Sequence, residues 1–163
     1  MSTRNRVLII LLSFFLLGHT ALIGQNNKKE KMEALSFLIG DWVGTSKILK
    51  NGLVEKEVPA FQKISYDLNQ HIIVIELQSE LLQLHTIIYF DEETSQYMYN
   101  PFSEKGVRKY PAELIDGKFI VSASEKNRFV FSRKSENTFQ EYGESLKDGK
   151  WIRYFEDNFT DIQ

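Results

Sequence analysis

The chain has 163 residues, with 20 Lys and Arg against 22 Asp and Glu, so its formal net charge is −2. A slight acidic excess, with the charges scattered along the chain, provides no basic surface of the kind that nucleic-acid binding requires. The sequence contains no cysteine, which excludes disulfides, thiolate metal sites and a cysteine nucleophile. The length suits a single domain that relies on its own hydrophobic core.

The N-terminal segment has the pattern of a secretory signal peptide. Two arginines precede an apolar run at residues 7–17, and small and polar residues follow it. This run is shorter than the about twenty apolar residues of a membrane-spanning helix. We expect residues 1–24 to be removed, with cleavage near Ala21 or Gly24, which leaves a secreted or periplasmic chain without a transmembrane span. An uncleaved anchoring helix is the alternative. Without the two arginines, the net formal charge falls from −2 to −4.

A polar spacer at residues 25–31 separates this segment from one domain at residues 32–163. Met32, Leu35 and Leu38 follow one another at intervals of three residues, which predicts a short helix of about two turns. Such a short helix is stable only when its apolar side is packed. We therefore expect it to plug one end of the domain core.

After this helix, the apolar pattern becomes alternating. Strand-like segments recur about every ten residues, and turn-forming pairs such as Asn51-Gly52 and Asp116-Gly117 separate them. The predicted strands are 42–49, 61–68, 71–78, 84–90, 96–100, 107–114, 118–123, 128–133, 138–144 and 151–159. Short turns favour a meander, so we predict an all-β fold: an antiparallel meander β-barrel of about eight to ten strands with a short N-terminal helix.

The first predicted strand carries the motif Gly40-x-Trp42-x-Gly44, directly after the apolar helical turn. This motif, with the hairpins that follow it, resembles the start of the lipocalins and fatty-acid-binding proteins of the calycin superfamily. The Tyr-Phe-Asp turn at residues 89–91 makes the chain similar, in particular, to bacterial lipocalin-like β-barrel domains of unknown function. The resemblance covers about residues 31–163.

The resemblance implies which residues stabilise the closed end of the barrel. In this family, the tryptophan seals that end and an arginine from a late strand packs over it. Structural roles are therefore implied for Gly40, Trp42 and Gly44, with Arg153 as the first candidate for the arginine and Arg133 as the second.

The interior of such a barrel is either filled by side chains or holds one small ligand. His85 is in phase with Ile87 and Tyr89 on an apolar strand, so its imidazole is predicted to point inward and to orient a polar group of the ligand. Strict alternation places further apolar residues on inner faces. The predicted ligand-binding residues are Ile73, Ile75, His85, Ile87, Tyr89, Phe119, Phe129 and Phe131.

We expect no metal site and no cofactor. His71 and His85 are the only histidines beyond the predicted signal peptide, too few for a multi-histidine zinc site. The related haem-binding barrels, the nitrobindins, use a histidine near the C-terminus, and this chain has none after His85.

The leading hypothesis is a secreted or periplasmic protein that binds a small apolar or amphipathic molecule inside the barrel, as a monomer or weak dimer. We assign no catalytic residue. Two alternatives stay open. The first is an isomerase or cyclase that uses His85, Tyr89 and a carboxylate in the barrel cavity. The second is a packed structural barrel that contacts another protein through its rim.

Overall fold

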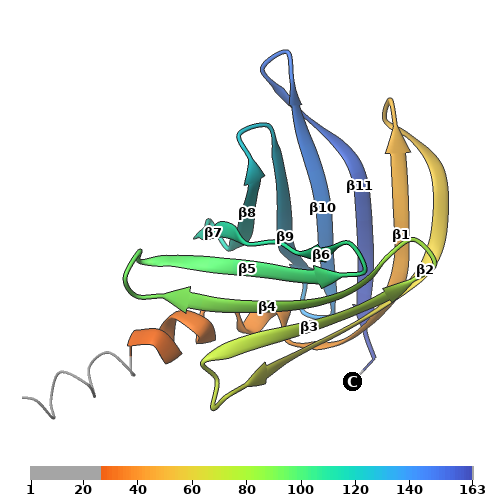
Figure 1. Ribbon diagram of the computed structural model, residues 1–163. Helices are drawn as coiled ribbons and strands as arrows, with labels where there is room; N and C mark the ends of the chain where they lie inside the picture. The colour runs from red at the N-terminus through yellow and green to blue at the C-terminus, as the bar shows by residue number, and fades with distance from the viewer. Residues whose placement is uncertain (1–26, 163) are drawn as a thin grey trace, which may run out of the picture.

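The computed structural model of the protein describes residues 27–162, so the predicted signal peptide at 1–24 lies outside the described residues. Eleven strands form one sheet (Figure 1). The strands are β1 (Gly40–Lys50), β2 (Leu53–Asp67), β3 (Ile72–Ser79), β4 (Gln83–Asp91), β5 (Gln96–Ser103), β6 (Gly106–Val107), β7 (Tyr110–Ile115), β8 (Lys118–Ser124), β9 (Asn127–Ser135), β10 (Thr138–Lys147) and β11 (Lys150–Asp161).

The sheet closes into a barrel. Neighbouring strands are antiparallel, β1 pairs with β11, and β4 pairs with β5, so ten strands form the ring while the short β6 pairs only with β5. Because each strand follows its neighbour along the chain and the last strand returns to the first, no edge of the ring is left unpaired. The predicted all-β antiparallel meander barrel is confirmed.

The N-terminal segment covers one end of this barrel, as predicted. Residues 27–33 are helical, and the 3-10 turn η1 (Ser36–Leu38) leads into β1. Met32, Leu35 and Leu38 are fully buried, and Figure 1 shows this segment beneath the barrel. The helix starts earlier than expected, inside the predicted spacer, because lysine and glutamate are good helix formers.

Three strand predictions differ from the structure. The strand β2 starts at Leu53 and passes through Pro59, and β5 continues through Pro101, which was expected to end it. Proline can remain in a strand where its ladder position needs no N–H. The strand expected at 107–114 is divided into β6, which pairs with Phe102 and Ser103 at the end of β5, and β7, which pairs with residues 97–99 of the same strand.

Trp42 lies at the closed end, where it is 2% exposed. Its indole Nε1 donates to the Leu38 carbonyl (2.9 Å), and its ring packs at 5.4 Å from the Phe139 ring. A Cβ on Gly40 would lie 2.9 Å from the indole, and one on Gly44 would lie 1.8 Å from the Asn158 carbonyl oxygen. Each glycine of the motif is therefore required for a close approach, of the indole in one case and of the strand β11 in the other.

Neither predicted arginine packs over Trp42. Arg153 lies on the outer face of β11, where its guanidinium stacks on the Tyr142 ring at 3.8 Å and donates to Glu156. Arg133 donates to backbone carbonyls in the β9–β10 turn, including that of Ser135 (2.8 Å). Phe139 and η1 cover the indole instead, so this part of the expectation was wrong.

Candidate functional site

The predicted ligand-binding residues separate into two groups. Four of them, Ile73, Ile75, Phe119 and Phe131, point inward and belong to the packed apolar core near the closed end. Phe129 is also on the inner side, where it is only partly buried. The inward orientation predicted for these five residues agrees with the structure.

The residues predicted on β4 face the outside. The His85 side chain is 64% exposed and lies 3.4 Å from Glu76 on the outer surface. Ile87 and Tyr89 share its face of the strand, since side chains alternate. The buried positions of β4 are Thr86, Ile88 and Phe90. The predicted inward orientation of His85, Ile87 and Tyr89 is therefore wrong: the inward-facing residues of β4 are the ones next to them in the sequence.

A layer of polar side chains crosses the barrel interior above the apolar core. Glu141 on β10 and Asp157 on β11 are direct neighbours in register and are 6% and 3% exposed. Gln62 reaches them from β2, and its Nε2 donates to Glu141 Oε2 (3.3 Å). Tyr99 is buried close enough for the charges of both carboxylates to act on its hydroxyl. We call Gln62, Thr86, Tyr99, Glu141 and Asp157 the polar layer.

The polar layer holds acceptor atoms without partners. Within residues 27–162, Gln62 Oε1 and Asp157 Oδ1 are buried and have no hydrogen-bond partner. Among the described residues, no Lys or Arg side chain forms an ion pair with Glu141 or Asp157. Buried polar atoms are nearly always paired, and leaving one unpaired costs about 1–3 kcal/mol. The layer can therefore accept further hydrogen bonds and positive charge.

Burial shifts both acids toward their neutral forms. It raises the pKa of Glu141 to about 8, with a further rise from the Asp157 charge and an opposing effect of the Gln62 hydrogen bond. Burial also raises the pKa of Asp157 to about 6, and the hydrogen bond of the Ser46 hydroxyl opposes this rise. Because one ionised carboxyl disfavours ionisation of its neighbour, the pair retains a proton to a higher pH than exposed acids do.

A cavity of about 190 Å³ lies beside this layer, toward the end of the barrel opposite the helix. Glu141 is its acidic residue, and Arg108 is its cationic residue. Four aromatic side chains line it; they are Tyr99, Tyr110, Phe129 and Phe155. The Phe129 ring lies 6.1–6.3 Å from each of the other three. The cavity therefore combines an aromatic wall with one buried carboxyl.

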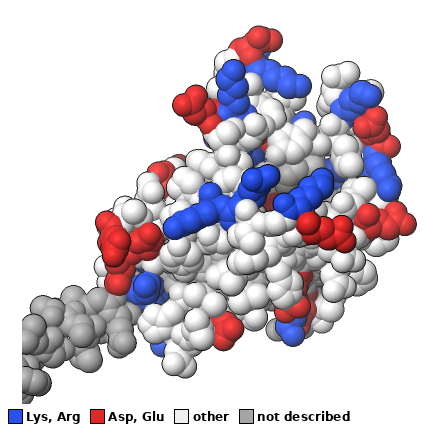
Figure 2. All heavy atoms as spheres, in the orientation of Figure 1, with Lys and Arg blue, Asp and Glu red and all other residues white. Residues whose placement is uncertain are grey.

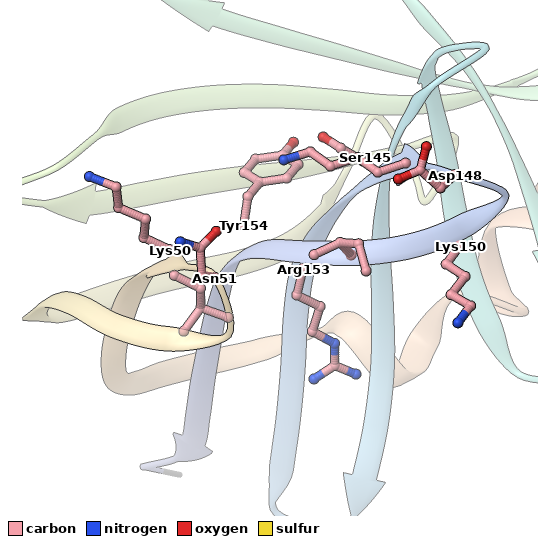
Figure 3. A pocket seen from close by; sticks show the side chains of 10 residues that line it. Lys50, Asn51, Ser145, Asp148, Lys150, Arg153 and Tyr154 are labelled. Atoms are coloured by element: carbon pink, nitrogen blue, oxygen red, sulfur yellow. The ribbon is translucent and has the colours of Figure 1, made fainter.

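A glycine and an irregularity in pairing make room for this wall. The register between β10 and β11 shifts at Gly143, which leaves Tyr154 without a direct partner on β10. A Cβ on Gly143 would lie 2.3 Å from the Phe155 ring and 2.6 Å from the Tyr154 ring. Figure 3 shows Tyr154 and Arg153 on opposite faces of β11. Burial raises the pKa of Tyr154, with a contribution from the Glu141 charge, so its hydroxyl lies on the inner side.

A larger hollow of about 550 Å³ lies between the β1–β2 turn and the β10–β11 hairpin (Figure 3). The pairing of β1 with β11 ends at Ile48 and Phe155, and the two hairpins diverge beyond that point. Its charged residues are at the surface, and Lys50 already pairs with Glu55 (3.3 Å). Since this hollow contains no buried acid, the smaller cavity beside Glu141 is the better candidate site.

The surface near the candidate site is basic on one side. Figure 2 shows Lys and Arg side chains in a row over β5 and β6. Lys105, Arg108 and Lys109 are exposed in this part of the chain. Within residues 27–162, no group of three or more His, Asp or Glu side chains is placed to hold a metal ion. In the same range, no helix has both the length and the apolar character needed to span a membrane.

Sequence reasoning missed Glu141 and Asp157. Both were detectable by phase: Glu141 lies two residues after Phe139, and Asp157 lies two residues before Phe159. Phe139 and Phe159 are fully buried core residues, and residues two apart on a strand share one face. A carboxylate in phase with a buried phenylalanine was thus the available signal.

Comparison with one solved structure supports the barrel fold, and no comparison identifies a family. No protein-family model and no curated protein matches the chain. The crystal structure of Rv2717c from M. tuberculosis superposes with a TM-score of 0.56 at 8% identity, over 81% of this chain and 97% of that one. A protein of unknown function from the DUF3598 family of Nostoc punctiforme PCC 73102 matches at 6% identity, over 80% and 98% of the two chains, with a TM-score of 0.30. The likeness to Rv2717c is one of barrel architecture.

Proposed function

We propose that the protein binds a small, partly apolar molecule in the open half of its barrel. The observation that carries this proposal is the cavity whose wall is aromatic and whose acidic residue, Glu141, is buried. Ligand pockets combine an apolar lining with a few convergent polar groups in this way. The cavity, at about 190 Å³, is smaller than the range of about 300–1,000 Å³ for drug-sized ligands. The guest is therefore small.

The contrast between the two halves of the interior favours binding over a purely structural role. At the closed end, residues such as Phe119, Phe131 and Ile88 are fully buried. At the open end, Phe129 and Phe155 remain partly accessible beside acceptor atoms that lack partners. A guest would cover the rings and donate to the acceptors, and both effects favour its binding.

The lipocalin-like relationship and export remain part of the proposal. The barrel architecture and the Gly40-x-Trp42-x-Gly44 motif support a carrier of the lipocalin type. The apolar run at 7–17 supports cleavage within or just after residues 21–24 and a secreted or periplasmic location. N-terminal sequencing of the exported protein tests this, with a start between residues 22 and 27 expected. Intact Met1 in the membrane fraction would contradict it.

Binding is tested by isothermal titration with 2-phenylethanol, a small neutral aromatic probe. A dissociation constant below about 1 mM is expected for the unmodified protein. Leu84→Trp should weaken binding at least about tenfold, because Leu84 lines the cavity. His85→Trp is the matched control, since it adds the same ring to the outer face of the same strand and should leave binding unchanged.

The outcomes separate this proposal from the packed-barrel alternative. Equal binding by Leu84→Trp and His85→Trp would place the probe outside the cavity. No binding by the unmodified, folded protein would favour a packed structural barrel. Native mass spectrometry of protein extracted mildly from the producing cell adds a direct search for a co-purified guest.

A second candidate function is acid–base catalysis in the same cavity. The observation that favours it is the pair of neighbouring buried carboxyls, Glu141 and Asp157, whose pKa values are both raised by burial. Such a pair offers one neutral acid and one charged base at neutral pH. Deuterium exchange at the activated carbon of phenylacetone, followed by NMR, tests it. Exchange that is absent, or that persists in Glu141→Gln, would exclude this candidate.

A further inference from the structure

We infer that the guest carries a primary ammonium group, and that the carboxyls of Glu141 and Asp157 receive it. This inference rests on the proposed binding function and names the chemical class of the ligand. It is drawn from the geometry of the polar layer, the composition of the cavity wall and the charges around them.

The acceptors of the polar layer match the donors of a primary ammonium. In the part of the chain that the structure describes, Gln62 Oε1 and Asp157 Oδ1 are buried without partners, and Glu141 borders the cavity. A primary ammonium has three N–H donors and no acceptor. Hydrogen bonds from an ammonium to a carboxylate are charge-assisted and about twice as strong as neutral ones. An ammonium in the cavity would donate first to Glu141, which lines it, and its charge would also compensate that of Asp157, the neighbour of Glu141 in register.

The aromatic wall suits the rest of the same guest. Tyr99, Tyr110, Phe129 and Phe155 surround the cavity from four different strands. A cation within about 6 Å of a ring centroid is attracted by the ring face, and more strongly where water is excluded. The same rings cover an apolar body attached to the ammonium.

The charges beside the polar layer disfavour an anionic group at that end of the cavity, although the cationic Arg108 lies elsewhere in its lining. The titratable groups around Glu141 are Asp157, Tyr99, Tyr110 and Tyr154, all of which are neutral or negative. Arg108 also lines the cavity, but it forms no ion pair with Glu141. A carboxylate guest would add negative charge beside Asp157, whereas an ammonium would supply the missing counter-charge.

Binding of an ammonium at Glu141 is linked to release of a proton, whereas binding in a purely apolar pocket is not. In the free protein, Glu141 holds its proton up to pH about 8. A bound ammonium favours the carboxylate form, so binding at pH 7 should release up to about one proton, and affinity should rise between about pH 6 and 8. Titration in phosphate and in Tris buffers, which have different ionisation enthalpies, measures this release.

The decisive experiment compares three probes of similar size: 2-phenylethylamine, 2-phenylethanol and phenylacetate. At pH 8, the amine should bind at least about tenfold more tightly than the alcohol. Glu141→Gln should lower the amine affinity at least about tenfold, lower the alcohol affinity far less and remove the proton release. Asp157→Asn should weaken amine binding as well. This variant tests the role of the carboxyl pair if Glu141→Gln does not fold. Leu84→Trp should weaken both the amine and the alcohol.

Each further outcome has a definite meaning. Equal affinity for amine and alcohol, or tighter binding of phenylacetate, would overturn the ammonium inference while leaving the binding function intact. Tight amine binding that releases no proton would place the amine away from the carboxyls and overturn the ammonium inference. Amine affinity that is unchanged in both Glu141→Gln and Asp157→Asn would do the same. Failure of all three probes would count against the proposed function itself.

Discussion

The two halves of the barrel interior follow different rules, although the same strands build both. The closed half is filled by apolar side chains and sealed by Trp42 and Leu38, with a hydrogen bond of 2.9 Å between them. The open half contains Glu141 and Asp157, unpartnered acceptors and a cavity. Along β10, buried Phe139 and buried Glu141 are only two positions apart, with Gln140 between them. The closed half therefore stabilises the fold, while the buried polar groups of the open half lower the free energy of unfolding.

This division explains how a chain without cysteine can keep an imperfectly packed interior. Burial of large apolar groups is the main favourable contribution to folding. Closure of the ring through β1–β11 and β4–β5 pairs every strand of the barrel. Unpaired acceptors, by contrast, reduce stability. We therefore expect changes in the closed half to alter stability and changes in the open half to alter pH dependence and binding.

The largest effect is expected from Trp42→Ala in the closed half. Truncating a buried large aromatic residue costs about 3–5 kcal/mol, and the hydrogen bond to Leu38 is lost as well. Chemical denaturation measures the change. Trp151→Ala is the control, because Trp151 is only partly buried and contacts Arg128 on the outer face, and it should cost about 1 kcal/mol. Similar losses for both tryptophans would remove the special role of the closed end.

The second effect is expected from Glu141→Gln in the open half. A carboxyl whose pKa is raised by folding binds its proton more tightly in the folded state. The free energy of unfolding should therefore fall as pH rises from about 4.5, the ordinary pKa, to about 8, the pKa in the folded protein. Glu141→Gln should remove most of this slope and stabilise the protein at pH 8.5 by about 2–4 kcal/mol.

Denaturation at several pH values measures this slope. Asp157 has its own raised pKa of about 6, so it should leave a smaller decline between about pH 4 and 6 in the variant. An unchanged slope in Glu141→Gln would show that Glu141 is ionised and solvated in the folded protein, and the contrast between the two halves would disappear.

The sequence predicted the fold well because the hairpins of a meander depend on patterns that are local. Turn pairs such as Asn51-Gly52, the stripe of Met32 and Leu35, and the position of Trp42 each constrain their own segment. The prediction that Arg153 packs over Trp42 was wrong, because the face of β11 on which Arg153 lies depends on the irregular pairing at Gly143. Local signals contain no information about such a register shift.

The site was predicted less well for a different reason. On β4, apolar residues occupy both faces, as Ile87 and Ile88 show, so alternation alone does not decide which face is inside. Thr86 points inward and His85 outward. The prediction had placed His85 inside because a histidine can orient a polar group of a ligand. The contact of Gln62 with Glu141 joins residues 79 positions apart, and only the closed barrel brings them together.

The third prediction concerns Gly143, which gives room to the aromatic wall. Gly143→Ala would place its Cβ against the Phe155 and Tyr154 rings, at 2.3 and 2.6 Å. We expect a loss of about 1–3 kcal/mol, together with weaker binding of 2-phenylethanol as the rings shift. Gly149→Ala is the matched control: its φ is 73°, with nothing within 4 Å of the new Cβ. It should cost about 1 kcal/mol through backbone strain and leave binding unchanged. Equal effects of the two variants on binding would show that Gly143 does not shape the cavity.

The smallest effect is expected from His85→Leu, which tests the orientation of β4 directly. The His85 imidazole lies 3.4 Å from the carboxylate of Glu76, and its side chain is 64% exposed. An exposed pair of this kind contributes about 0–1 kcal/mol, so the free energy of unfolding should change by less than about 0.5 kcal/mol. Binding of 2-phenylethanol and of 2-phenylethylamine should not change, because the imidazole lies on the far side of the barrel wall. A loss of binding in His85→Leu, at unchanged stability, would mean that the outer face of β4 contacts the guest, and the cavity beside Glu141 would then lose its place as the binding site.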